Sequence, residues 1–327
     1  MRNKTRVLPL VIVLLLLSFP MVNDSRSALI LLTQIFIFAV FAMSYDLLLG
    51  YTGIVSFGHA MFFGIGAYSV GIGMNNFGNS IGTLLLSLLV GVIAAAVVSY
   101  LVGILSLRLK SHFYAMLTLA FAELFFVLAE KMRSVTKGND GFPFPVPDLF
   151  RDRISFYYIG LVFMVAIFLL LRQFTVSPLG SVMQAIRENV QRTQSLGYEV
   201  VHYKVIASVV AGVIAALSGS MYALMLRFVN SSVFTMDITL DALLMTIIGG
   251  IGTIYGGIIG AALIELAHEL LTNLAKVYPI FERWIIFFGL LYILVVMVFP
   301  LGIAGTCKQW LAQRKSATSK KRKGLSW

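Results

Sequence analysis

The chain has 327 residues, of which 59% are hydrophobic and only 12% are charged. Its mean hydropathy is +0.92. A soluble domain needs charged residues at roughly a quarter of its positions, so this composition excludes an ordinary soluble protein and requires lipid around most of the surface. The net charge of +11 does not indicate a nucleic-acid partner, because the basic residues lie between apolar segments. The single cysteine, Cys307, excludes an internal disulfide.

The apolar segments predict an all-α fold, a polytopic transmembrane helical bundle. Each segment is close to the ~20 residues that a helix needs to cross the hydrocarbon. In chain order they are Val7–Val22, Ala28–Leu49, Ile54–Asn76, Ile81–Leu107, Phe113–Glu130, Phe156–Leu171, Tyr203–Leu226, Leu240–Leu271 and Trp284–Ile303.

Nine spans would place the two termini on opposite sides of the membrane, whereas both termini are basic and both favour the cytoplasm. The long segment Leu240–Leu271 is interrupted by glycines at Gly249, Gly250, Gly252, Gly256 and Gly257. If it folds as two shorter spans, the count becomes about ten. More of the Lys and Arg residues then lie inside than outside, so the charge distribution favours ten spans with Gly-broken helices.

The beginning of the chain leaves two alternatives. Val7–Leu17 follows three basic residues and precedes Ser25–Ala28, so it is either a retained first helix, which we prefer, or a cleaved signal peptide. We expect a single transmembrane permease domain over residues 1–307, with a cytoplasmic loop at 173–202, and a basic cytoplasmic tail at 308–327. The polar stretch Lys131–Ser155 is expected outside.

Glycine placement marks two regions of the predicted bundle. Half of the 28 glycines lie in the segments Gly50–Gly78 and Gly249–Gly260. Glycines permit close helix packing, and they also interrupt helices that line a transport pathway; the sequence favours neither explanation over the other.

Ionisable residues at membrane depth face a cavity or a partner as a rule, because a buried charge there costs at least ~2.5–3.5 kcal/mol. For any one of these residues alone, pairing with a structural partner is a more frequent role than lining a pathway. Together with the glycines they define a predicted pathway set: Tyr45, Asp46, Gly53, Ser56, Gly58, His59, Gly252 and Gly256.

A short amphipathic helix is predicted within the cytoplasmic loop, over Met183–Leu196, between the breakers Pro178 and Gly180 and the breaker Gly197. Such a helix either lies at the membrane interface or presents a stiff lever to a soluble partner.

Five blocks of sequence, in order, resemble the permease family of ABC-type branched-chain amino acid importers, of the LivM type. They are Tyr45–Ala60 with Gly64–Tyr68, Thr136–Gly141, Ser177–Gly197, Gly249–Thr253 and Phe299–Gly305. The third block resembles the loop that couples such permeases to their ATPases. It departs from the family pattern at Ser181, where a basic residue is usual, and in the polar stretch Val190–Ser195.

The resemblance implies an ATPase-coupling loop with the following residues: Pro178, Gly180, Ala185, Ile186, Arg187, Glu188, Asn189 and Gly197. It also implies that Asn139 and Asp140 contact a binding protein outside the membrane. The implied partners are two ATP-binding subunits, a second related permease, an extracytoplasmic solute-binding protein and membrane lipids. The implied location is a bacterial or archaeal cell membrane.

The chain itself is expected to be no enzyme. It contains no G-x-x-x-x-G-K-[ST] motif, so ATP and Mg²⁺ must bind to a partner. Its four histidines have no metal-ligand spacing, so neither a metal site nor a cofactor is expected. Two alternatives remain: an ABC permease for urea or short amides, and an ion-coupled secondary transporter using Asp46, His59 or Glu123.

Overall fold

The computed structural model describes residues 4–22, 25–106 and 111–276, and further on residues 286, 289–290, 293, 297–298 and 302–306. The predicted basic tail at 308–327 lies outside the described residues, as does most of the segment Trp284–Ile303.

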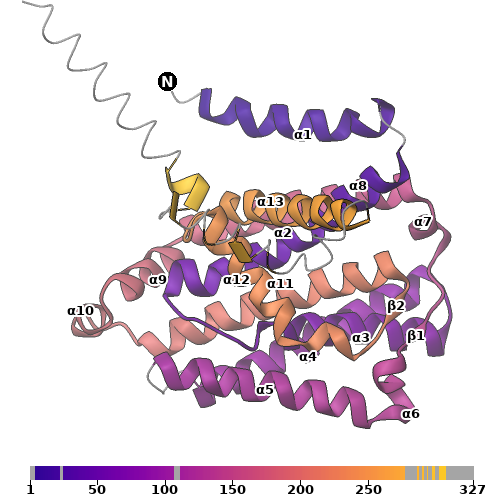
Figure 1. The fold of residues 1–327 in the computed structure, drawn as a ribbon. Coiled ribbons are helices and arrows are strands. Elements are labelled where there is room, and N and C mark those ends of the chain that lie inside the picture. The colour runs from indigo at the N-terminus through magenta and orange to yellow at the C-terminus, as the bar shows by residue number, and fades with distance from the viewer. Residues whose placement is uncertain are drawn as a thin grey trace, which may run out of the picture.

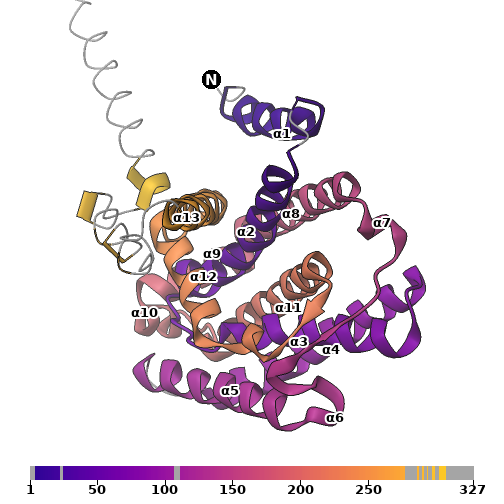
Figure 2. The same ribbon diagram turned by 45° about the vertical axis from the view of Figure 1, so that its right-hand side comes forward.

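The chain folds into helices that run alongside one another (Figures 1 and 2). The first part contains α1 (Lys4–Val22), α2 (Arg26–Thr52), α3 (His59–Phe77), α4 (Ile81–Ser106) and α5 (Ser111–Lys131). A connecting segment follows, with α6 (Arg133–Thr136), the 3-10 turn η1 (Gly138–Asp140), β1 (Phe142–Pro143) and α7 (Asp148–Arg151). The second part contains α8 (Arg153–Val176), α9 (Pro178–Glu188), α10 (Val190–Ser195), α11 (Val200–Leu226), β2 (Phe228–Val229), η2 (Ser231–Phe234), α12 (Met236–Gly249) and α13 (Ile254–Ala275).

Six of the described helices are long and apolar enough to cross a membrane, namely α2, α4, α5, α8, α11 and α13. The predicted all-α polytopic class is therefore confirmed. The six helices differ in how much of their apolar stretch is buried inside the protein. The buried share is 67% for α2 but only 22% for α4. Helix α2 is thus the centre of the bundle, and α4 presents most of its apolar surface to the outside, where lipid can cover it.

Glycines let α3 and α11 pack closely against each other. A Cβ on Gly66 would collide with the carbonyl of Ala216 in α11, and a Cβ on Gly219 would collide with the carbonyl of Phe63. Close approach of backbones through small residues is the usual way in which helices associate in lipid. For these glycines the structure supports the packing explanation.

The predicted interruption of Leu240–Leu271 is confirmed. Helix α12 ends at Gly249, helix α13 begins at Ile254, and Gly250 and Gly252 between them have φ of 122° and 80°. The two helices return on each other, because a Cβ on Gly249 would collide with the carbonyl of Gly256, and one on Gly260 with that of Met245. They form a hairpin whose tip is the turn at residues 250–253.

The two polar connecting regions lie at opposite ends of the bundle, as the charge pattern requires. In Figure 1, α9 and α10 are at one end, and α6, α7 and the strands are at the other. The strands pair antiparallel, with Phe142 opposite Val229 and Pro143 opposite Phe228.

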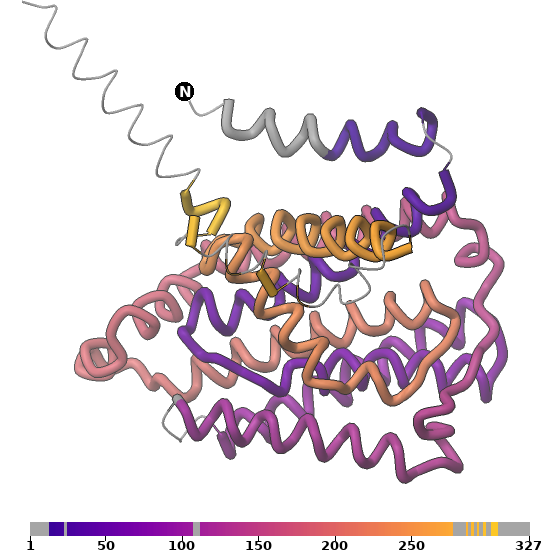
Figure 3. The backbone as a smooth tube through the Cα atoms, viewed as in Figure 1, coloured from indigo at the N-terminus to yellow at the C-terminus, as the bar shows by residue number. Residues whose placement is uncertain are grey.

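The coloured part of the first helix, Val13–Val22 of α1, lies along the outside of the bundle, next to α8 (Figure 3). Its described contacts there include two hydrogen bonds to its backbone, from the hydroxyl of Tyr157 to the carbonyl of Leu16 at 2.7 Å and from that of Tyr158 to Leu17 at 3.2 Å. Helix α8 itself begins at the capping residue Asp152, whose carboxylate accepts from the Ser155 amide, a bond that holds the pKa of this carboxyl below its usual range.

Replacing Gly219 with alanine should destabilise the bundle by about 1–3 kcal/mol, because the added Cβ would force α3 and α11 apart. Thermal unfolding of the purified protein in detergent measures this. Gly82→Ala is the matched control, since its Cβ would meet nothing closer than the Ser80 hydroxyl at 3.7 Å. Equal melting temperatures for both variants would contradict the close α3–α11 packing.

Candidate functional site

The predicted coupling segment forms two helices, α9 and α10, so the single helix expected over Met183–Leu196 is wrong. Helix α9 begins earlier, with Pro178 in its first turn and the Ser177 hydroxyl accepting from the Gly180 amide at 3.4 Å. It ends at Glu188, because Asn189 takes an extended conformation, and the Asn189 side chain then caps α10 by accepting from the Arg192 amide at 2.9 Å. Side-chain capping competes with helix continuation at such a residue.

The segment is amphipathic in the folded protein. Gly180, Met183 and Ile186 are buried, and a Cβ on Gly180 would collide with the carbonyl of Thr175, so α9 lies directly against the end of α8. The polar face remains open: Ala185, Arg187, Glu188, Asn189 and Gly197 are all exposed. A partner can therefore reach this face while the opposite face is held by the bundle.

Arg187 connects α9 to the end of α2. Its guanidinium donates a hydrogen bond to the carbonyl of Gly50. That carbonyl belongs to the last turn of α2, where carbonyls lack helical partners and where the helix dipole attracts a positive charge. The stem of Arg187 passes beside Gly53, whose added Cβ would lie 3.4 Å from the arginine Cγ.

Asp46, one turn before Gly50, connects α2 to the tip of the hairpin. Its Oδ1 accepts from the Gly252 amide at 2.7 Å. The carboxylate reaches Gly252 across Gly50, one turn further along α2, because a Cβ on Gly50 would lie 2.7 Å from the carboxyl carbon of Asp46. Asp46 is 1% exposed, and its Oδ2 has no hydrogen-bond partner among the described residues.

These contacts form one junction between three elements, defined by Asp46 and Gly50 of α2, Arg187 of α9 and Gly252 of the hairpin tip. A Cβ on Gly252 would lie 2.6 Å from a guanidinium nitrogen of Arg187, so the arginine also touches the tip. A cavity of about 500 Å³ opens beside the junction, lined by Gly50, Tyr51, Gln184, Arg187, Glu188 and Gly252. The sequence assigns Arg187 to coupling and Asp46 and Gly252 to a pathway, and the structure brings both sets together.

The residues between α2 and α3 form an extended segment that runs back along α2. The hydroxyl of Tyr45 donates to the Ser56 carbonyl at 3.0 Å, although Tyr45 lies two turns before the end of its helix. Thr118 of α5 accepts from the Phe57 amide at 3.2 Å, and Thr239 of α12 accepts from the Ala60 amide at 2.9 Å. Helix α3 therefore begins inside the bundle, with the Ala60 amide of its first turn and the Phe57 amide just before it bonded to side chains of distant helices.

His59, the first residue of α3, is fully buried among aromatic rings. Its Nε2 lies 2.8 Å from the hydroxyl of Ser44, which itself donates to the Phe41 carbonyl. The imidazole must therefore donate from Nε2, which leaves Nδ1 without a described partner. Of the predicted pathway residues, Tyr45, Asp46, Ser56, Gly58, His59 and Gly256 are buried, and Gly53 is exposed.

The predicted outer contact residues lie at the other end of the bundle from α9. Asn139 and Asp140 are exposed in the turn η1, between Lys137 with φ of 57° and Gly141 with φ of 62°. Ser231 donates to the Asn139 side chain at 3.5 Å. The turn is thus fixed on its inner side and open on its outer side.

Sequence reasoning missed Gly50, Tyr51 and Gln184 of the cavity, and Thr118 and Thr239 behind the extended segment. The threonines are ordinary members of apolar helices, and no spacing in the chain connects them to His59. Within the part of the chain that the structure describes, no cluster of His, Cys, Asp and Glu could hold a metal ion.

Comparison with known proteins supports the sequence resemblance. Residues 27–297 match the family described as branched-chain amino acid transport system / permease component. This chain is 24% identical to the high-affinity branched-chain amino acid transport system permease protein LivM of Salmonella typhimurium. The match covers 76% of this chain and 64% of that protein. LivM of Escherichia coli is 24% identical over 90% of this chain and 73% of its own length.

An archaeal relative extends the comparison. A probable branched-chain amino acid transport permease protein LivM of Methanocaldococcus jannaschii is 23% identical over 82% of this chain and 90% of its own length. No solved structure matches the chain.

Replacing Gly50 with alanine should displace the Asp46 carboxylate from the Gly252 amide, at a cost of about 1–3 kcal/mol in stability. Thermal unfolding in detergent measures the loss. Gly160→Ala in α8 is a milder control, because its Cβ would meet the Thr33 side chain at 3.3 Å. A wild-type melting temperature for the Gly50 variant would show that the junction is not held in this way.

Proposed function

Since the chain belongs to the family of permease components of branched-chain amino acid transport systems, we propose that it is one permease subunit of an ATP-driven importer for branched-chain, hydrophobic amino acids. The substrate class is taken from the names of the relatives. One observation carries the mechanism: Arg187 of the exposed helix α9 contacts both α2 and the tip of the α12–α13 hairpin.

We infer the following division of labour. Two ATP-binding subunits bind ATP and Mg²⁺, and their ATP-driven closure displaces α9 through its exposed face. Arg187 passes this displacement to the end of α2 and to the hairpin tip, which Asp46 holds together. The bundle then changes between its outward-open and inward-open states. The chain performs transport and no chemistry of its own.

The other partners act at the opposite end and at the side of the bundle. A solute-binding protein delivers the amino acid from outside to the exposed turn at Asn139 and Asp140. A second, related permease completes the pathway. The pathway residues Gly53, Ser56, Gly58, His59, Gly252 and Gly256 line the route in an open state, and most of them are buried in the arrangement described above.

We further propose about ten spans, with both termini in the cytoplasm of a bacterial or archaeal cell membrane. Helices α3 and α12 add two passes to the six long apolar helices, and α1 and the last apolar segment add the others. The location of α9 and of the turn η1 at opposite ends of the bundle supports this orientation.

Replacing Arg187 and Glu188 with alanine should lower substrate uptake by about tenfold or more, because it removes the connection between α9 and the junction. Uptake and ATP hydrolysis are measured on reconstituted transporter, with membrane insertion checked by yield. Arg192→Ala removes a charge from the same segment without touching α2. Unchanged uptake in the double variant would refute the lever role, and an equal loss in both variants would attribute the effect to charge alone.

Purification of the chain from its native membranes in mild detergent should recover two ATP-binding subunits and a second permease, identified by mass spectrometry. The associated binding protein should bind leucine, isoleucine or valine in calorimetry. Binding of urea or a short amide would change the substrate assignment. Recovery of the chain alone, with uptake driven by an ion gradient, would contradict the importer.

A further inference from the structure

A second cavity, of about 260 Å³, lies at the end of the bundle opposite α9, between the first turns of α2 and α8 and the last turn of α11. Its walls are mainly apolar. The lining residues are Arg26, Leu29, Ile30, Thr33, Phe150, Arg151, Arg153, Phe156, Leu224, Met225, Leu226 and Arg227. Four arginines from four elements therefore converge on one small apolar space.

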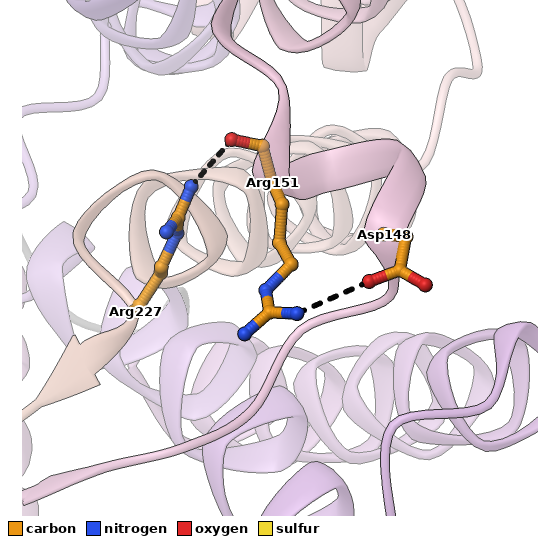
Figure 4. Close-up of polar contacts among 3 residues, drawn as sticks. All are labelled: Asp148, Arg151 and Arg227. Carbon is orange, nitrogen blue, oxygen red and sulfur yellow. Dashed lines mark hydrogen bonds and ion pairs between the residues drawn. The ribbon is translucent and has the colours of Figure 1, made fainter.

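Two of the arginines, Arg151 and Arg227, are held by polar contacts, but the cluster as a whole is not neutralised. Figure 4 shows that Arg227 donates to the carbonyl of Arg151, at 2.8 Å, and that Arg151 pairs with Asp148 at 3.2 Å. This ion pair is exposed, with 66% and 89% of the two side chains accessible, so it is weak. Arg26, Arg153 and Arg227 form no ion pair with any described residue, and the nearby Asp152 accepts from Ser155.

The positions of these charges are unfavourable for the protein alone. Arg26 and Arg153 are the first residues of α2 and α8, where the helix dipole repels a cation. Arg227 has φ of 55°, a conformation that a non-glycine residue adopts only at a cost. An anion in the cavity would offset the mutual repulsion of the arginines and would also be attracted by both helix N-termini.

Apolar residues lie one turn deeper on each of the three helices. Ile30 follows Arg26 by four positions, Phe156 follows Arg153 by three, and Leu224 precedes Arg227 by three, so each shares a helix face with its arginine. Two lining residues remain open to the surroundings, Ile30 with 42% and Leu226 with 47% of their surface exposed. A charged rim above an apolar, accessible wall is complementary to a molecule that has an anionic head and a hydrocarbon tail.

We propose that this cavity binds an anionic phospholipid. The headgroup phosphate lies among Arg26, Arg153 and Arg227, which supply charge-assisted hydrogen bonds, and an acyl chain lies along Ile30 and Leu226. A free anion of the same charge would bind the arginines but would leave the apolar wall uncovered. An acidic protein partner would contact the arginines at the rim but not the apolar residues below them. The inference requires only a membrane permease, so it stands or falls separately from the transported substrate.

The test uses the full-length chain in phosphatidylcholine nanodiscs, with labelled phosphatidylglycerol as the probe. Arg26→Gln combined with Arg153→Gln should weaken phosphatidylglycerol binding about 25-fold, on the basis of about fivefold for each charge removed near the membrane surface. These two substitutions leave the Arg227–Arg151–Asp148 contacts in place. Lys131→Gln combined with Arg133→Gln removes two charges at exposed sites of the same end, and should change the affinity less than about twofold, because neither side chain lines the cavity and solvent screens it from a phosphate held there.

Three results would overturn the proposal. The first is that the wild-type protein binds phosphatidylglycerol no more tightly than phosphatidylcholine; this comparison needs no variant. Inorganic phosphate could displace the lipid at equal concentration, which would assign the cavity to a soluble anion. The double variant could keep its lipid affinity while losing the response of uptake to the binding protein, which would assign the arginines to an acidic protein partner.

Discussion

A backbone that leaves its helix inside a membrane must find hydrogen-bond partners within the protein, because hydrocarbon supplies none. This constraint governs the centre of the molecule, where α2 ends, α3 begins and the α12–α13 hairpin turns. Each of these breaks exposes amides or carbonyls, and each is satisfied by a side chain from a distant element: Arg187 for Gly50, Asp46 for Gly252, and Thr239 for Ala60. The positions of the broken helices therefore depend on one another.

The same constraint explains why the exposed helix α9 and the interior of the bundle share a junction. Helix α9 could rest on the membrane surface by its apolar face alone, through Met183 and Ile186. Arg187 adds a directional bond to a carbonyl that is otherwise unsatisfied, so a movement of α9 cannot leave α2 unaffected. Asp46 extends the same dependence to the hairpin. Geometry of this kind is what the conversion of ATPase movement into a change of access requires.

The sequence predicts the class of fold and the interruption at Gly249–Thr253, because apolar length and glycine clusters are local signals. It does not predict that Phe57 and Ala60 bond to Thr118 and Thr239, since these residues meet only after the bundle has formed. It also misplaces the helix within the loop at 173–202, because Asn189 can cap a new helix as well as continue an old one. Arg187 and Asp46 are both identified as important, but their proximity cannot be read from positions 141 residues apart.

Helix α12 has 14 residues, which at 1.5 Å per residue gives about 21 Å, against a hydrocarbon core of about 30 Å. Such a segment is too short to be stable as an independent span in lipid. Helix α12 packs against α13 and also against α2, where the Thr246 hydroxyl donates a hydrogen bond to the Ala42 carbonyl. Helix α12 is therefore stable in a membrane only while it packs against both α13 and α2.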